Sequence, residues 1–381
     1  MQEIFIVGAG KIGKGFLGEV YHTAGWKLSF LDKDPEVANA MRDAGKYTVK
    51  VHETEKTYDH IVDGYDVYLT DPAYSCRDAF LRADLMALAL YPADIDDAAA
   101  YLAPLLEARA KENPAQKLTI LSCTNKNHIM AHIEGEFLKP LSPAVQDWFR
   151  ENVALRDVII RRGTTSPSPA ALELETKAIA TLLIQSPVYC DLSQVPWMEL
   201  KDNIEQLKDI KLYTYNSTHA CCAFASYLKG YTTINEGMAD PEIFDLVQEV
   251  LDESCAGLVK EFPITEKELY DFCYVLRTKL QSPHTDYVFR VAYDPMRKLS
   301  HNDRLTGNAL TCLKHGIDPK ALIQSIANGM AYAEPRDPKA MEIQALIRDK
   351  GIAAAVSQVC ELPQDHELVQ RVSTLYEKIG R

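Results

Sequence analysis

Short apolar runs alternate with amphipathic segments along the first half of the chain. The apolar runs predict buried parallel strands at residues 3–8, 27–32, 84–92 and 117–125. Helical spacing of apolar residues predicts helices between them, at residues 14–25, 35–45 and 94–112. This alternation is typical of a doubly wound α/β domain, and we expect strands at residues 157–162 and 171–177 to extend its sheet.

Long helical patterns replace this alternation after residues 182–198. They cover residues 201–230, 241–262, 265–280 and 319–333. We therefore place a domain boundary near residue 190. The expected fold class is α/β, with a doubly wound N-terminal domain at residues 1–190 and a mostly α-helical C-terminal domain at residues 191–381.

The first apolar run ends in the glycine pattern G-x-G-x-x-G, formed by Gly8, Gly10 and Gly13. In a strand–turn–helix unit the first glycine permits a sharp turn. The second lets the backbone approach a pyrophosphate, and the third permits close helix–strand packing. The helix that follows would direct free N–H groups at the phosphates. We expect a dinucleotide to bind along Gly8, Gly10, Lys11, Ile12 and Gly13; a glycine turn without a ligand is the alternative.

Asp32 ends the second predicted strand, where a carboxylate can accept hydrogen bonds from both ribose hydroxyls of NAD. Its negative charge would oppose the 2′-phosphate of NADP, although Lys33 and Lys14 could soften that repulsion. NAD is therefore the expected cofactor. A flavin dinucleotide could occupy a similar turn, but it would leave the motif of the C-terminal half without a role.

That second motif is Lys211, Asn216 and His219, spaced K-x4-N-x2-H in a helical segment. At about 100° per residue, Asn216 lies about 140° from Lys211, and His219 lies between them at about 80°. All three can face one cleft. Lys211 can serve as a base if its pKa is lowered. Asn216 can stabilise an oxyanion, and His219 can bind a hydroxyl or orient the lysine. An amphipathic helix without a ligand is the alternative.

Two further segments of the sequence could contribute side chains to such a cleft. Asn125 follows a predicted strand, at the end where open α/β sheets bind ligands, and an ordinary loop asparagine is the alternative. Arg290, Arg297, Lys298 and Arg304 lie within a short span and could clamp a phosphate or carboxylate. The alternative for this span is a solvated surface.

Composition narrows the class of protein. The net charge of −13 over 381 residues disfavours nucleic acid as a partner, and no apolar run is long enough to span a bilayer. The N-terminus shows no secretion signal, so we expect a cytoplasmic protein. The nine cysteines contain no C-x-x-C pair and are expected to be reduced. We expect no metal site.

Several motifs together resemble the polyol-specific long-chain dehydrogenases, and most of all the mannitol-1-phosphate 5-dehydrogenases. They are "VGAGKIGKGFLG", "FLDKD", "SCTN", K-x4-N-x2-H and "RVAYDPMRKLSHNDRL". The resemblance extends over nearly the whole chain. It implies a Rossmann domain, a largely helical domain, and metal-independent transfer between NAD(H) and a polyol/ketose pair in the cleft between the domains.

The resemblance also implies residue roles. Lys211 would be the general base, and Asn125 and Asn216 would form the oxyanion-binding pair. His219 would position the substrate, and Arg297 lies in the segment that contacts its far end.

The chain departs from the family pattern at two places. The family often carries an acidic residue where this chain has Thr124, and Asp-Arg where this chain has Arg161 and Arg162. Both changes remove negative charge and favour an anionic substrate. Arg162 therefore joins Arg297 and Lys298 as a candidate substrate-binding residue, although Arg161 could simply face solvent.

We thus expect an NAD-dependent enzyme that interconverts a polyol phosphate and a ketose phosphate, specifically mannitol 1-phosphate and fructose 6-phosphate. The alternatives are a dehydrogenase of an unphosphorylated polyol or sugar acid, a hydroxyacid dehydrogenase, or a non-catalytic NAD-binding sensor. The expected partner is a small molecule, with no nucleic acid and no membrane. A monomer and a small homo-oligomer both fit the sequence.

Overall fold

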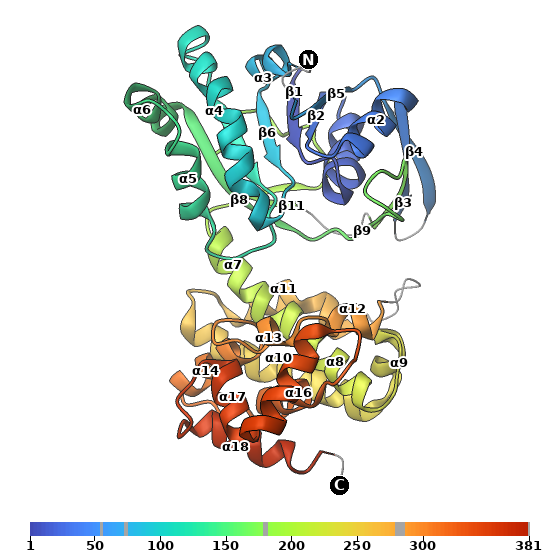
Figure 1. Ribbon diagram of the computed structural model, residues 1–381, viewed down its shortest axis with the longest axis vertical. Helices are drawn as coiled ribbons and strands as arrows, with labels where there is room; N and C mark the ends of the chain where they lie inside the picture. Colours follow the sequence, from blue (N-terminus) through green and yellow to red (C-terminus); the bar gives the residue numbers. More distant parts are fainter. Residues whose placement is uncertain (54–55, 72–74, 178–181, 279–285, 380–381) are drawn as a thin grey trace. The chain divides into compact units, whose positions relative to one another are not determined.

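The structure, a computed structural model, describes residues 1–53, 56–71, 75–177, 182–278 and 286–379 (Figure 1). The chain divides into two compact units, Met1–Leu207 and Lys208–Arg381. The first unit is α/β and the second is almost entirely helical, as the hydrophobic pattern predicts. The first unit extends beyond residue 190 and includes residues 191–207.

The first unit is built on an eight-stranded sheet of order β12-β11-β8-β7-β6-β1-β2-β5. Its strands are β1 (Glu3–Val7), β2 (Lys27–Asp32), β5 (Asp66–Leu69), β6 (Leu85–Leu88), β7 (Leu118–Ser122), β8 (Val153–Ile160), β11 (Leu182–Gln185) and β12 (Met198–Lys201). The strands from β5 to β8 in this order run parallel, and β11 is antiparallel to β8. The chain reverses its direction of winding between β1 and β6, which is where doubly wound sheets bind ligands.

Both faces of this sheet are covered, because alternate residues of β1 enter different apolar clusters. Ile4 and Ile6 pack with residues of the glycine-rich helix and α2, whereas Phe5 and Val7 pack with residues of α3 to α6. The helices are η1 (Gly13–Gly18, a π-helix), α1 (Glu19–Thr23), α2 (Pro35–Ala44), α3 (Arg77–Arg82), η2 (Pro92–Asp94, a 3₁₀ turn), α4 (Ile95–Glu112), α5 (Met130–Leu138) and α6 (Pro143–Asn152). Burial on both faces explains the continuous apolar runs of the strands.

A second, four-stranded sheet belongs to the same unit, in the order β4-β3-β10-β9. Its strands are β3 (Lys46–His52), β4 (Thr57–Asp63), β9 (Thr164–Thr165) and β10 (Glu173–Lys177). The expectation that residues 171–177 extend the main sheet is therefore wrong: β10 pairs in parallel with β3. Its residues alternate between buried and exposed, as suits a sheet covered on one face. No sequence pattern above predicts the β3–β4 hairpin.

The second unit is a helical assembly around α8. Its helices are η3 (Leu212–Asn216, a π-helix), α8 (Ser217–Leu228), α9 (Ile234–Ala239), α10 (Pro241–Glu261), α11 (Glu266–Thr278), α12 (Val288–Ala292), α13 (Pro295–Lys298), α14 (Thr306–Lys314), α15 (Lys320–Ala331), α16 (Pro338–Lys350), α17 (Ile352–Cys360) and α18 (Glu367–Tyr376), and α7 (Ile204–Lys211) leads into it. The sequence predicts a helix over residues 265–280. Residues 279 and 280 lie outside the described part of the chain.

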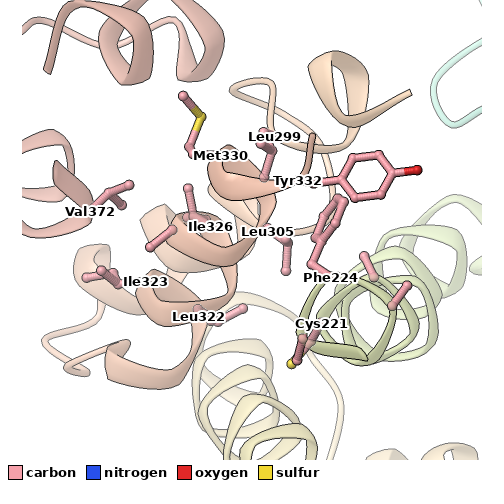
Figure 2. Packing of buried hydrophobic residues seen from close by; sticks show 14 of the residues in the cluster. Cys221, Phe224, Leu299, Leu305, Leu322, Ile323, Ile326, Met330, Tyr332 and Val372 are labelled. Atoms are coloured by element: carbon pink, nitrogen blue, oxygen red, sulfur yellow. The ribbon is translucent and has the colours of Figure 1, made fainter. Parts of the chain in front are cut away.

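Helix α8 is apolar on most sides because other helices surround it. Figure 2 shows Cys221 and Phe224 of this helix among side chains of α15, and the rings of Phe224 and Tyr332 lie 5.6 Å apart. The K-x4-N-x2-H motif enters this core directly, so its backbone is held firmly. Within the described residues, no helix combines the length and the apolar character that crossing a bilayer requires.

Candidate active site

The glycine turn has the geometry that a dinucleotide requires. Gly8 has φ +97°, and a Cβ there would lie 2.5 Å from the carbonyl oxygen of Ala89. A Cβ on Gly13 would lie 1.9 Å from the carbonyl oxygen of Gly8, so the helix can approach the turn only without a side chain. A Cβ on Gly10, by contrast, would meet no atom within 4 Å, which leaves its backbone open to a ligand.

Asp32 is fixed at the carboxyl end of β2. Its Oδ2 accepts a hydrogen bond of 2.6 Å from the backbone N–H of Ala9, and its Oδ1 accepts one of 2.9 Å from that of Asp34. Each carboxylate oxygen keeps a further lone pair for a ligand hydroxyl. A cavity of about 490 Å³ opens beside it, lined among others by Gly8, Gly10, Asp32 and Tyr101. The sequence motif and Asp32 therefore converge on one hollow of the first unit.

Two lysines near Asp32, Lys33 and Lys14, each donate hydrogen bonds to acceptors within the protein. The amine of Lys33 lies 2.7 Å from Asp94 Oδ1, and this hydrogen bond raises the pKa of Lys33. The amine of Lys14 is buried and donates to the carbonyl oxygens of Pro169, at 2.8 Å, and Ala171, at 2.9 Å. Burial lowers the pKa of Lys14 to about 8. Both amines thus have acceptors of their own in the neighbourhood of Asp32.

The two residues between the glycines differ in exposure. Lys11 is exposed, and Ile12 is half-buried against the apolar cluster under the main sheet. Ile12 therefore packs the turn, and only Lys11 extends into solvent.

The first prediction concerns the ribose. Asp32→Ala removes an acceptor of two hydroxyl hydrogen bonds, so we expect the Kd for NADH to rise by about 10–100-fold. The repulsion of a 2′-phosphate also falls, so the preference for NADH over NADPH should narrow. Titration of nicotinamide fluorescence with both cofactors measures this. Asp97→Asn is the control, because Asp97 lines the same cavity on α4. An unchanged preference in Asp32→Ala would show that the ribose is held elsewhere.

The second motif departs from ordinary helical geometry. Residues Leu212–Asn216 form a π-helical turn, in which the N–H of Ser217 donates to the carbonyl of Leu212 five residues earlier. Residues five apart are therefore one turn apart here, so Lys211 and Asn216 lie on the same face of the helix. The angle of about 140° expected for an α-helix does not apply. Lys211, Asn216 and His219 are all half-buried.

His219 lies in cationic surroundings. Burial lowers the pKa of its imidazole, and the charges of Arg290, Arg304 and Lys298 lower it further, while Asp286 opposes them. Arg290 is ion-paired to Asp286. The segment 290–305 therefore contributes its charge to the surroundings of the motif histidine, rather than forming only a solvated surface.

Within that segment the two candidate residues behave differently. Arg297 is exposed, and its guanidinium bonds Asp294 at 3.2 Å and Asp303 at 3.4 Å. Lys298 is buried, and its amine donates to the carbonyl oxygen of Tyr293. Burial, together with the charges of Arg297 and Arg304, lowers the pKa of Lys298 to about 7.

Arg304, the last of the four cations that the sequence groups in this span, is largely enclosed. Its Nε lies 2.7 Å from Asp303 Oδ1.

Two candidates of the first unit lie in different settings. Asn125 is exposed and follows β7, at the carboxyl edge of the sheet. Arg162 is buried, and its Nη2 donates to Glu19 Oε2 at 2.7 Å while its Nε donates to Thr176 Oγ1 at 2.9 Å. Because its guanidinium is enclosed in this ion pair, we leave Arg162 out of the substrate site proposed below.

One group of side chains in the described residues has the spacing of a metal site. Asp96, His132 and Glu136 each bring a ligand atom within 4.8 Å of the others. Asp96 and His132 are exposed, and the 3.0 Å hydrogen bond between them accounts for their proximity. The group lies on α4 and α5, and none of its members belongs to the motifs discussed above.

Solved structures share this fold over nearly its full length. The Pseudomonas fluorescens mannitol 2-dehydrogenase in ternary complex with NAD and D-mannitol matches with a TM-score of 0.75 and 15% identity, over 99% of this chain and 91% of that chain. A D-sorbitol dehydrogenase in substrate-free form matches with a TM-score of 0.77 and 14% identity, over 99% and 92%. A PanE/ApbA family ketopantoate reductase from Ralstonia eutropha JMP134 is more distant, with a TM-score of 0.52 and 12% identity, over 90% and 100%.

Sequence profiles of families identify both halves of the chain. The mannitol dehydrogenase Rossmann domain matches residues 2–181, and the mannitol dehydrogenase C-terminal domain matches residues 203–380. The glycine turn with Asp32 falls in the first match, and the K-x4-N-x2-H motif falls in the second. Since the two matches together span almost the whole sequence, the chain belongs to the mannitol dehydrogenase family of polyol oxidoreductases.

Proposed function

We propose that this NAD-dependent polyol dehydrogenase interconverts a polyol phosphate and a ketose phosphate, specifically mannitol 1-phosphate and fructose 6-phosphate. The observation that carries the proposal is Lys298, a buried amine that acts, with Arg290 and Arg304, on the imidazole of His219. Among the described residues no carboxylate is ion-paired with its amine, although the charges of Asp294 and Asp303 oppose the lowering of its pKa. Burying a cation without such a partner is costly. A bound anionic ligand would supply a negative charge beside the amine and so reduce the cost of burying Lys298.

The chemistry proposed for the motif is alcohol oxidation. The glycine turn and Asp32 would hold NAD, which would supply the acceptor for the hydride of the carbinol carbon. Lys211 takes the hydroxyl proton as general base. Asn216, one helical turn away on the same face, donates a hydrogen bond to the oxygen as it becomes a carbonyl, and Asn125 is the second proposed donor. His219 binds a neighbouring hydroxyl. The products are the ketose, NADH and one proton.

The phosphate of the substrate is proposed to bind Lys298, with Arg290 and Arg304 adding positive potential. Charge-assisted hydrogen bonds to phosphate oxygens are about twice as strong as neutral ones. Arg297 is exposed and already bonded to Asp294 and Asp303, so we assign it a secondary part at the rim.

A turnover panel tests the substrate class. NADH formation or consumption is followed with mannitol 1-phosphate, fructose 6-phosphate, mannitol, sorbitol and uronates at equal concentration. We expect turnover with the phosphorylated pair alone. Comparable turnover with mannitol would favour the unphosphorylated alternative. The mannitol 2-dehydrogenase and D-sorbitol dehydrogenase that share this fold are named for unphosphorylated polyols. Cofactor binding without turnover on any substrate would favour a sensor.

The second prediction isolates Lys298. Lys298→Met should raise the KM for the phosphorylated substrate by about 10–100-fold, as expected when one charge-assisted contact is lost. In the parent protein that KM should rise as the pH is raised through about 7, because the amine, whose pKa is about 7, loses its proton there. The variant should lack this rise.

The control for that prediction is Arg297→Met, which removes a neighbouring cation that already has two carboxylate partners. We expect a smaller increase of KM, and the rise of KM with pH should persist but move to higher pH, because the charge of Arg297 lowers the pKa of Lys298. Steady-state kinetics between about pH 6.5 and 9 provides both readings, since a phosphate monoester is mainly dianionic above its second pKa of about 6. Equal effects of the two substitutions would argue against a direct contact by Lys298.

A further inference from the structure

The π-helical turn Leu212–Asn216 leaves its backbone carbonyls with unusual partners. In an α-helix the carbonyl of Tyr213 would accept from the N–H of Ser217, but that N–H donates to the carbonyls of Leu212 and Thr214. The carbonyl of Tyr213 instead accepts a hydrogen bond of 2.8 Å from the side-chain nitrogen of Asn308. Asn308 lies on α14, 95 residues further along the chain.

Threonines of the motif helix hold the neighbouring carbonyls in the same way. Thr214 Oγ1 donates to the carbonyl of Ile210 at 2.7 Å, and Thr218 Oγ1 donates to that of Thr214 at 2.8 Å. These bonds lie within the helix itself. Asn308, by contrast, is a side chain of another element that donates to a backbone carbonyl of the turn.

Asn308 is itself anchored in the core. It is fully buried, and its Nδ2 also lies 2.7 Å from Ser254 Oγ on α10 and 3.2 Å from Ser217 Oγ. Ser254 Oγ donates its own proton to the carbonyl of Val250, so it serves Asn308 as an acceptor. Among the described residues, nothing donates to Asn308 Oδ1. An unpaired buried acceptor is unfavourable, so the favourable contacts of this amide are those that its nitrogen makes.

We propose that Asn308 is a positioning residue for catalysis: it holds the π-turn and thereby keeps Lys211 and Asn216 one turn apart on one face. This rests on the roles given to Lys211 and Asn216 in the proposed function. Without the donor, the turn can relax to α-helical geometry. The two side chains would then diverge by about 140° and could not approach one substrate oxygen together.

The test compares Asn308→Ala with Lys211→Ala and with Ser325→Ala in the full-length protein. Ser325 is also buried in the second unit, and its hydroxyl bonds the carbonyl of Ala321 within α15. Ser325→Ala therefore measures the cost of losing a buried hydrogen bond elsewhere. We expect Asn308→Ala to lower kcat by about 10²-fold, as misplacement of a reacting group does, with the KM for NAD unchanged. Ser325→Ala should keep the parental kcat.

The pH profile separates positioning from general destabilisation. If the turn relaxes, the surroundings of Lys211 change, so the ascending limb of kcat/KM that reports the proposed base should move along the pH axis. A general loss of stability would lower the amount of active enzyme without moving that limb. If Asn308→Ala does not fold, Asn308→Leu replaces it, because it keeps the volume of the side chain and still removes the donor.

The outcomes separate this inference from the proposed function. An inactive Lys211→Ala beside an Asn308 variant with parental kcat and pH profile overturns the positioning role and leaves the proposed function intact. A fully active Lys211→Ala overturns the base assignment, and the positioning role is lost with it. A reduced kcat and a moved limb in the Asn308 variant, with Ser325→Ala unaffected, support the inference.

Discussion

Lys211→Ala is expected to lower kcat by about 10²–10⁴-fold, the range that a positioned general base contributes. The hydroxyl proton of the polyol must leave as the hydride does, and the variant lacks the amine that is proposed to receive it. Binding of NADH should stay within about twofold, because the dinucleotide is proposed to bind at the glycine turn and Asp32. Steady-state kinetics and a fluorescence titration measure the two quantities.

Small primary amines provide the control for this prediction. An amine that enters the space left by the side chain should restore part of the turnover of Lys211→Ala. The restored rate should increase with the basicity of the amine, as general base catalysis requires. Parental turnover in Lys211→Ala would contradict the assignment of Lys211 as the base. A rescued rate that does not change with the basicity of the amine would contradict it as well.

Arg162→Met is expected to destabilise the protein by about 3–5 kcal/mol, the loss typical of breaking a buried ion pair on one side. The substitution leaves the carboxylate of Glu19 enclosed without its 2.7 Å partner. Arg162 also bonds Thr176 of β10 and lies 5.2 Å from the ring centroid of Phe16 in the glycine-rich helix. Chemical denaturation followed by circular dichroism measures the free energy of unfolding.

The double variant Glu19→Gln with Arg162→Met is the control, because it removes both charges and should recover part of the loss. A double variant as unstable as Arg162→Met alone would contradict this explanation.

The cofactor half of the site could be predicted from the sequence because its determinants are local. Gly8, Gly10 and Gly13 occupy one turn, and Asp32 ends the next strand. A strand, a glycine turn and a helix follow one another without interruption, so pattern alone is enough to place them. The same locality explains why the helical character of the second unit was predicted correctly.

The parts that could not be predicted depend on contacts between distant residues. Lys33 is directed to Asp94, 61 residues away, and Arg162 to Glu19, 143 residues away. The segment 171–177 has the composition of a strand, but β3 determines which sheet it joins. Lys298 resembles a surface cation in sequence, and only the folded core encloses it.

The turn at 212–216 holds one residue more than an α-helical turn, which bears on how this family can diverge. Deleting one residue there would restore a regular helix at little cost to secondary structure. Lys211 and Asn216 would then be four residues apart, about 40° around the helix, and still on one face. Straightening the turn without a deletion would instead separate them by about 140°. An alignment of relatives should therefore show a one-residue gap here only where the helix is regular.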